Sequence, residues 1–162
     1  MSGPQLKAAT RRVQAALAER ALDLEVREFP AGTRTAEQAA AAIGCSVAQI
    51  AKSLIFRTRE SDRPVLAVVS GVNRADESKL AALVGEAIGR ADADFVRART
   101  GFAIGGVPPL GHAEAVITFL DADLQAYEEI WAAAGTPSSV FRLTPQELQR
   151  VTDAGFADLR ME

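Results

Sequence analysis

The segment from Thr100 to His112 constrains the fold of this chain more than any other stretch. It contains four glycines, and its adjacent prolines, Pro108 and Pro109, exclude a helix interior and disfavour a central strand. The segment is apolar and uncharged, whereas a flexible surface linker is polar. We therefore expect a rigid, partly buried loop whose glycines let a ligand or a second backbone come close.

This loop offers backbone N–H groups that can hold a carbonyl oxygen or a developing oxyanion. The expected donors are the N–H groups of Gly105, Gly106, Val107, Leu110 and Gly111. A tight connection between strands, with no ligand, explains the same spacing equally well because Gly/Pro-rich loops are common.

Length and composition predict an ordinary soluble domain that spans residues 1–162 and has a real core. The net charge of −3 argues against an extended, sequence-independent nucleic-acid surface, but it allows a local basic patch that grips one end of an RNA. Solvated surface charges are the alternative reading of the same residues. One candidate patch comprises Arg57, Arg59, Arg63 and Arg74, and a second comprises Arg90, Arg97 and Arg99.

The chain has one cysteine, Cys45, and one histidine, His112. This excludes an internal disulfide and a cysteine-based zinc site and argues against a transition-metal site, so we expect no metal. No cofactor is implied by the sequence. Residues 1–10 lack the apolar core of a signal peptide, and no apolar run is long enough to span a membrane. These features predict a cytoplasmic protein without a membrane segment.

Apolar spacing and capping residues predict a series of separate helices and strands. The strands come singly, in pairs and between helices, which favours an α/β (α+β) fold with a mixed sheet or partial barrel and helices outside. The expected helices are 4–21, 36–43, 77–84, a short one ending near 99, 124–134 and one that follows Thr144. The expected strands are 24–29, 51–57, 64–70, 113–120 and 138–143.

Lys52 is the second informative residue, because on the predicted strand it shares a face with Leu54 and Phe56. That position points a lysine at the core or at a cavity, which is unfavourable unless the charge is used or its pKa is lowered. Taken alone, the residues favour a strand that begins one residue later, with Lys52 extending to solvent from a helix end.

Other common chemistries find little support in the sequence. A Ser-His-Asp site is conceivable with His112, but no serine lies in a Gly-x-Ser-x-Gly turn, and a structural histidine is the commoner case. Cys45 precedes a helix start that could lower its pKa, although a small buried residue is the commoner role. The glycines of the loop lack the Lys-Ser/Thr of a phosphate-binding P-loop.

Lys52 and the loop together resemble the YbaK/ProX family of aminoacyl-tRNA deacylases, which is related to the editing domain of prolyl-tRNA synthetase. The resemblance covers about residues 33–148. The matching segments are Ala51-Lys52-Ser53-Leu54-Ile55-Phe56, Val65 to Gly71, Thr100-Gly101-Phe102, Gly105-Gly106-Val107-Pro108-Pro109-Leu110-Gly111 and Leu120-Asp121. It implies a mixed, mostly antiparallel, barrel-like sheet surrounded by helices.

The resemblance also implies an activity, namely hydrolysis of the ester between a wrong, small and uncharged amino acid and tRNA, often tRNA-Pro. The family lysine corresponds to Lys52, and the Gly-x-x-x-Pro loop runs from Gly105 to Pro109. Lys52 would hold a phosphate, a ribose hydroxyl or the carbonyl, while the N–H groups of Gly105, Gly106 and Val107 would orient the carbonyl. The 2′-hydroxyl of the substrate would then position the water or act as the base, so that no protein nucleophile is required.

The expected substrate site has further walls, and its specificity is left open between alanine, serine, threonine and similar side chains. Asp121 either binds the substrate ammonium or caps the next helix. The candidate substrate-binding residues are Phe29, Thr33, Thr35, Ile43, Pro109, Gly111, His112 and Asp121, with Ala51 and Ile104 as further pocket walls.

The partner implied by the resemblance is the 3′ end of an aminoacyl-tRNA, with prolyl-tRNA synthetase or another synthetase as a further one. Two alternatives stay open: a Cys-tRNA(Pro) deacylase subtype, and a non-catalytic module that binds a tRNA end or an aminoacyl-adenylate. Nothing in the sequence reports the oligomeric state.

Overall fold

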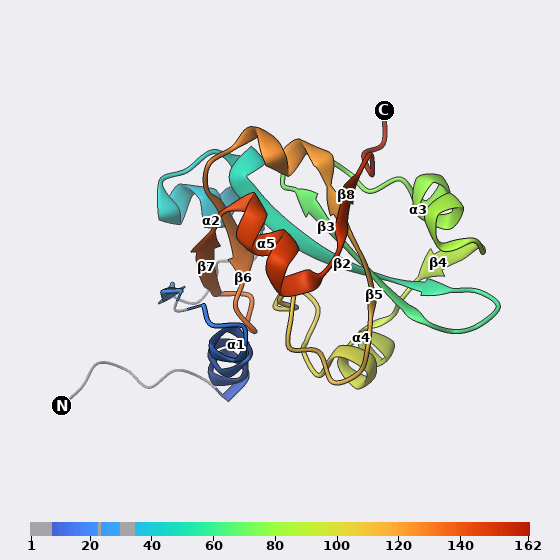
Figure 1. Ribbon diagram of the computed structural model, residues 1–162, viewed down its shortest axis with the longest axis horizontal. Helices are drawn as coiled ribbons and strands as arrows, with labels where there is room; N and C mark the ends of the chain where they lie inside the picture. Colours follow the sequence, from blue (N-terminus) through green and yellow to red (C-terminus); the bar gives the residue numbers. More distant parts are fainter. Residues whose placement is uncertain (1–7, 23, 30–34) are drawn as a thin grey trace.

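The computed structural model describes residues 8–22, 24–29 and 35–162, so the start of the first predicted helix and the candidate Thr33 lie outside it. At its centre, β2 (Ile50–Thr58) and β3 (Pro64–Ser70) form a long antiparallel hairpin (Figure 1). The strands predicted over 51–57 and 64–70 are confirmed. All seven residues of β3 are buried, because the strand packs against side chains on both of its faces.

The hairpin belongs to a mixed sheet with the strand order β1-β7-β6-β2-β3-β5-β8, in which β4 also pairs with β2. Among the described residues, four strand pairs are antiparallel (β1·β7, β2·β3, β2·β4 and β6·β7) and three are parallel (β2·β6, β3·β5 and β5·β8). The predicted mixed sheet, antiparallel in most of its pairs, is therefore confirmed. The other strands are β1 (Val26–Glu28), β4 (Ile88–Arg90), β5 (Ile117–Asp121), β6 (Ile130–Ala133), β7 (Ser139–Leu143) and β8 (Gly155–Ala157).

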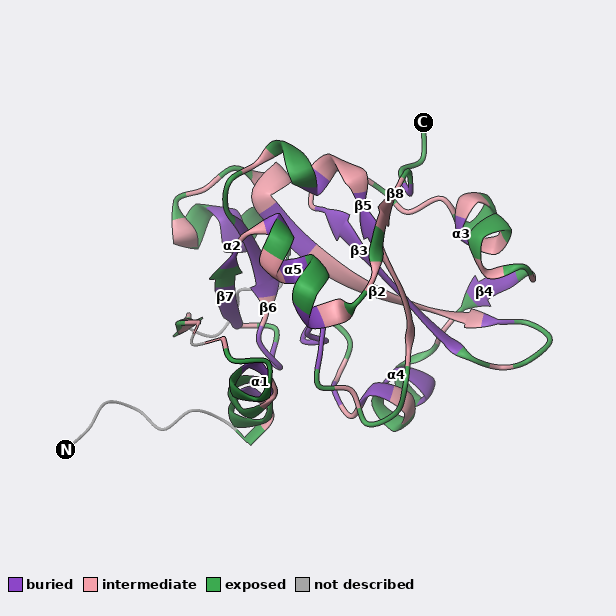
Figure 2. Cartoon of the chain, viewed as in Figure 1, coloured by how far each residue is buried: buried purple, intermediate pink, exposed green. Residues whose placement is uncertain are grey.

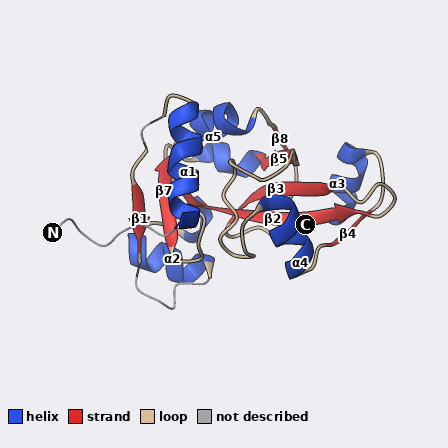
Figure 3. Cartoon of the chain, turned by 90° about the horizontal axis from the view of Figure 1, so that it is seen from below, coloured by secondary structure: helices blue, strands red, loops and turns tan. Residues whose placement is uncertain are grey.

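Helices lie at both ends of the sheet, with α1 and α2 beside β1 and β7, and α3 and α4 beside β4 (Figure 3). Their ends are set locally. A capping box joins Thr35 and Gln38, another joins Thr144 and Glu147, and Asp76 caps α3. The helices are α1 (Ala8–Glu19), α2 (Ala36–Ile43), α3 (Glu77–Val84), α4 (Ala93–Thr100) and α5 (Pro145–Thr152), with 3₁₀ turns η1 (Val47–Gln49) and η2 (Ala122–Ala126).

The main core lies between the sheet and α1, α5 and the Thr100–His112 loop. Leu66 and Val68 of β3 contact it from one face of the strand, and the opposite face packs against a second cluster that contains Leu80 of α3. Figure 2 shows β3 buried along its length, whereas most of β2 is of intermediate burial. Phe102 from the loop is 2% exposed, so the loop is anchored in the core, as its apolar character predicted.

The predicted helix over 124–134 is wrong. Leu124 ends up in the short turn η2, and the chain then enters β6, which pairs with β7 and with the start of β2. Ile130 and Trp131 are buried between neighbouring strands, and this long-range pairing overrides the local preference for a helix. Asp121 caps η2. The sequence also missed the three-residue strands β4 and β8.

Candidate functional site

A cavity lies beside a gap in the described part of the sheet. On one side, β2 pairs continuously with β3. On its other side, β2 pairs with β6 only at Ile50 and Ala51, and with β4 only from Phe56 onward. No described strand occupies that side of residues 52–55, and a cavity of about 470 Å³ opens there. This volume is within the range of small-molecule sites.

The cavity wall combines residues from several elements that are distant in the sequence. They come from β2, the start of α2, the end of β4, the Thr100–His112 loop and the segment that joins β6 to β7. The described lining residues are Thr35, Ala36, Ala39, Ile50, Ala51, Lys52, Ser53, Leu54, Ile55, Phe56, Arg90, Ala91, Val96, Ile104, Gly105, Val107, Trp131, Ala133, Pro137, Ser139 and Val140. Most are apolar, and the charged side chains among them are both cations.

Lys52 lies inside β2 and lines the cavity, so the interpretation of a later strand start is wrong. Burial lowers the pKa of Lys52 below its ordinary value of 10.5, and Arg74 lowers it further, whereas Glu37 and Asp121 act in the opposite direction. A half-buried ammonium of this kind is suited to an anionic or carbonyl oxygen that enters the cavity.

The glycine-proline loop contributes Gly105 and Val107 to the wall. Gly105 has φ +87°, a conformation that favours glycine. The N–H of Gly106 donates to the carbonyl of Ala103 at 3.0 Å within a turn, so the prediction of Gly106 as a carbonyl donor requires correction. Gly106 instead allows close packing, because a Cβ atom there would lie 2.7 Å from the Cα of Thr136.

Of the predicted substrate-binding residues, Thr35 lines the cavity. Its hydroxyl also accepts a hydrogen bond from the Gln38 N–H at 3.1 Å and so fixes the start of α2. Phe29 and Ile43 lie behind the wall, packed against the cluster that contains Trp131 and Val140. The predicted pocket walls Ala51 and Ile104 do line the cavity.

The second half of the loop serves as support for the first. Nε2 of His112 lies 2.7 Å from the carbonyl oxygen of Pro108, and burial lowers the pKa of this imidazole. Pro109 is buried, and Gly111 has φ +81° and lies close to Ala16 of α1. Pro109, Gly111 and His112 do not belong to the described cavity wall.

Asp121 is buried behind the site and acts as a cap. Its carboxylate accepts hydrogen bonds from the backbone N–H of Ser70 at 3.0 Å, the Asn73 amide at 2.8 Å and the backbone N–H of Asp123 at 3.0 Å. It also lies outside the described cavity wall. Of the two roles considered for Asp121, the structure shows the capping role.

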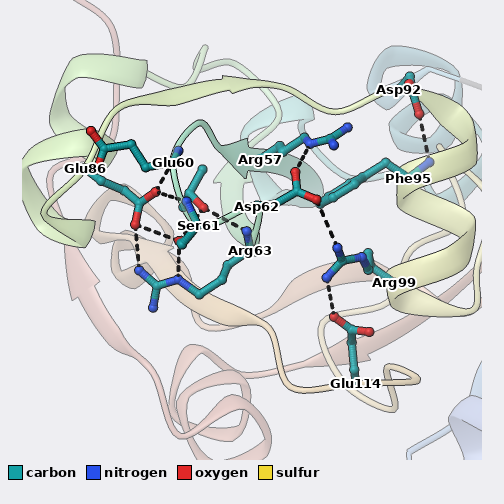
Figure 4. A network of polar contacts seen from close by, with 11 residues as sticks. Arg57, Glu60, Ser61, Asp62, Arg63, Glu86, Asp92, Phe95, Arg99 and Glu114 are labelled. Atoms are coloured by element: carbon teal, nitrogen blue, oxygen red, sulfur yellow. Dashed lines mark hydrogen bonds and ion pairs between the residues drawn. The ribbon is translucent and has the colours of Figure 1, made fainter.

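Several arginines of the two candidate basic patches are neutralised by acidic neighbours (Figure 4). Asp62 pairs with both Arg57 and Arg99, and Arg99 also contacts Glu114 at 2.9 Å. Arg63 pairs with Glu86 at 3.0 Å. Arg90 is different, because it lines the cavity at the end of β4.

The sequence reasoning missed Ser53, Arg90 and Pro137 as cavity residues. Ser53 could have been chosen from the sequence because it directly follows Lys52. Arg90 and Pro137 reach the cavity only through strand pairing and loop contacts, which the local sequence does not indicate. Burial raises the pKa of the Cys45 thiol, which is the opposite of what an activated nucleophile requires.

Within residues 8–22, 24–29 and 35–162, no group of three or more His, Cys, Asp or Glu side chains is arranged to hold a metal ion. In the same residues, no helix combines the length and the apolar character needed to cross a membrane.

Comparison with known proteins assigns the family. The model of the aminoacyl-tRNA editing domain matches residues 30–151. A Bacillus subtilis protein, YwhH, is 38% identical over 124 residues, which are 76% of this chain and 78% of that protein. EbsC of Enterococcus faecalis, a candidate Cys-tRNA(Pro)/Cys-tRNA(Cys) deacylase, is 29% identical over 126 residues, which are 77% of this chain and 76% of that protein.

A crystal structure described as a candidate trans-editing enzyme for prolyl tRNA synthetase superimposes with a TM-score of 0.92 at 48% identity, covering 98% of this chain and 100% of the other. The fold and the family matches agree with one another. The chain belongs to the aminoacyl-tRNA editing domain family of trans-editing deacylases and is a hydrolase that acts on aminoacyl-tRNA.

Proposed function

We propose that this protein is a free-standing deacylase that removes a small, uncharged amino acid, such as alanine, serine or threonine, from mischarged tRNA-Pro. The observation that carries the proposal is the charge of the cavity. Its described wall contains the cations Lys52 and Arg90 but no Asp, Glu, His or Cys. Such a wall attracts phosphate and carbonyl oxygens and repels cationic side chains, while Ala36, Ala39 and Ala133 provide short apolar contacts.

The residue types of the cavity wall also limit which groups can position the attacking water. Because the described wall offers no carboxylate or imidazole, the attacking water is positioned by the substrate itself, through its 2′-hydroxyl. Water adds to the ester carbonyl carbon, the bond to the ribose oxygen breaks, and that oxygen takes up a proton from water. Lys52 holds the terminal phosphate or a ribose hydroxyl, and the N–H groups of Gly105 and Val107, two residues of the wall, are the proposed donors to the carbonyl.

We further propose that residues 1–162 work as one unit on the 3′ end of the tRNA and receive substrate released by prolyl-tRNA synthetase. The similarity to a candidate trans-editing enzyme for prolyl tRNA synthetase supports this partner. A Cys-tRNA deacylase activity is the second candidate, because EbsC is described by that substrate.

The test is deacylation of tRNA-Pro charged with Ala, Ser, Thr, Cys or Pro by the wild type and by Lys52→Ala. We expect the wild type to clear a small amino acid, and Lys52→Ala to lose at least about 100-fold in kcat/KM. Lys79→Ala is the matched control, because Lys79 pairs with Asp158 away from the cavity.

Clearance of Cys-tRNA alone would replace the proposed specificity with the cysteine subtype. Binding of an aminoacyl-adenylate analogue without hydrolysis of any ester would overturn the catalytic proposal.

A further inference from the structure

The backbone hydrogen bonds of β2 alternate in direction along the strand. The carbonyl of Ile50 accepts from the N–H of Gly71 at 2.7 Å, and the N–H of Thr58 donates to the carbonyl of Arg63 at 3.0 Å. The register between these two points is unbroken. In an antiparallel pair, residues with this bonding alternate with residues whose N–H and C=O point to the opposite edge. Ser53 and Ile55 belong to the second group.

The opposite edge is open at those two residues. β6 occupies it as far as Ala51, and β4 occupies it from Phe56, so among described strands none reaches Ser53 and Ile55 on that side. Both residues line the cavity. Their backbone donors and acceptors therefore face the space into which the substrate enters, and a free strand edge is a ready template for another extended backbone.

The side chain of Ser53 adds a second, independent observation. Its Oγ is buried and has no hydrogen-bond partner, and it is the sole buried side-chain nitrogen or oxygen in that condition within the described residues. Such groups are rare in folded proteins and call for a partner. Ser53 points to the face opposite Lys52, because successive strand residues alternate. Ala51 and Ile55 share that face, and both pack in the cluster that contains Val107 of the loop.

We propose that the aminoacyl group of the substrate docks on the free edge of β2 as a one-residue strand. Its α-amino group donates to a backbone carbonyl of the edge and to Oγ of Ser53. Its ester carbonyl accepts one hydrogen bond from an edge N–H in addition to the loop donors. The edge N–H takes the place of the Gly106 N–H, which is bonded to Ala103 within its turn.

This inference rests on the proposed function and deepens it. Recognition comes from the part that all α-amino acids share, so Ser53 is a substrate-positioning residue, and the side-chain walls alone select the amino acid. The two faces of β2 also divide the work, with Lys52 toward the phosphate or ribose and Ser53 toward the reacting ester.

The first experiment removes the amino group from the substrate. Alanyl-tRNA-Pro is compared with propionyl-tRNA-Pro, which keeps the methyl group of alanine but has hydrogen in place of the amine. If another amino acid is the best substrate, its own des-amino acid is used. We expect the wild type to lose about 10- to 100-fold in kcat/KM on the propionyl ester, as for hydrogen bonds to a charged group. Equal rates on the two esters overturn the inference.

The second experiment changes the edge. Ser53→Ala should lose about 10-fold on the aminoacyl ester and much less on the propionyl ester, and its melting temperature should not fall, because the hydroxyl has no partner in the protein. Ser53→Thr keeps the hydroxyl and should restore activity. Ser53→Pro removes the backbone N–H as well as the hydroxyl. Because this N–H makes no bond to β3, its loss affects only the open edge. We expect Ser53→Pro to hydrolyse both esters more slowly than Ser53→Ala does.

The outcomes separate the two proposals. A wild type that hydrolyses no aminoacyl ester overturns the proposed function and the inference together. An active wild type with Ser53→Ala equally active, or equally impaired on both esters, overturns the inference alone. Should Ser53→Pro fail to fold, the comparison of the two esters by the wild type and Ser53→Ala still decides.

Discussion

At the scale of single residues, the site depends on two kinds of departure from ordinary preference. Lys52 places an ammonium where burial disfavours the charge, and Ser53 leaves a buried hydroxyl without a partner. Both features lower the stability of the folded protein, and both are explained if they serve to bind a ligand. Gly106 has a different role, because it lets the loop approach the backbone of Gly135 and Thr136.

The pKa of Lys52 makes substrate binding sensitive to alkaline pH. Because burial lowers this pKa, Lys52 loses its charge at lower pH than an ordinary lysine, and affinity for a substrate analogue with a non-hydrolysable 3′-amide should fall as pH rises through that value. In Lys52→Arg the charge persists, so the fall should disappear from titrations followed by fluorescence anisotropy. An identical alkaline profile in both proteins would assign the effect to another group.

The same shift has a defined sign for stability. The unfolded chain binds the lysine proton more tightly than the folded protein, so the charge of Lys52 is destabilising at neutral pH and becomes less so as pH rises. Lys52→Met should therefore leave the melting temperature at pH 7 unchanged or higher, while abolishing activity.

Gly106→Ala should destabilise the protein by about 1–3 kcal/mol, because the new Cβ would meet backbone atoms that cannot move aside. Urea denaturation measures the change. Gly155→Ala in β8 is the matched control, since a Cβ there meets nothing within 4 Å. If the two variants proved equally stable, close packing of the loop against Thr136 would not be the reason for glycine at position 106.

At the scale of elements, the turn between β2 and β3 is fixed by a carboxylate. Glu86, just before β4, accepts hydrogen bonds from the backbone N–H of Ser61 at 2.9 Å and its hydroxyl at 2.7 Å, and pairs with Arg63 at 3.0 Å (Figure 4). This clamp ties the tip of the central hairpin to β4, whose pairing with β2 closes one end of the cavity.

These hydrogen bonds, first of all the one from the Ser61 N–H, lower the pKa of Glu86 from 4.5 to about 2. The stabilisation is complete above pH 4.5 and is lost as pH falls toward 2. Melting temperatures measured from pH 6 to pH 2 should therefore fall less steeply for Glu86→Gln than for the wild type. Glu128→Gln, an exposed glutamate outside the clamp, should follow the wild-type slope.

At the scale of the whole molecule, α1 is part of the same structure as the site, although it precedes the residues matched by the family model. Val13 and Leu17 are buried in the main core. Arg12 donates to the carbonyl of Gly101 at 2.8 Å and lies over the Phe102 ring, so the helix holds the start of the loop.

Leu17→Ala should lower the free energy of unfolding by about 2–5 kcal/mol in a single cooperative transition, because a fully buried leucine leaves a cavity. Leu83→Ala on α3, where the side chain is 46% exposed, should change it by less than about 1 kcal/mol. Separate transitions for α1 and the sheet in Leu17→Ala would show that α1 folds independently.

The sequence by itself determined the features that depend on neighbours within a few residues. Capping boxes at Thr35 and Thr144, and the left-handed glycine after α3, form within one helical turn, so their residues are sufficient to predict them. The continuous apolar run of β3 likewise required burial on both faces. Lys52 and the Gly105–Val107 segment could be chosen as site candidates from their motifs.

Only the tertiary structure decided which groups face the cavity. Residues 130–133 became a strand because β2 and β7 offered partners, and the edge of β2 stayed open because β6 and β4 end before they meet. The turn that occupies the N–H of Gly106 and the unpartnered hydroxyl of Ser53 depend on the same long-range packing. Hydrogen bonds between residues far apart in the chain depend on how the sheet assembles, so the local sequence does not predict them.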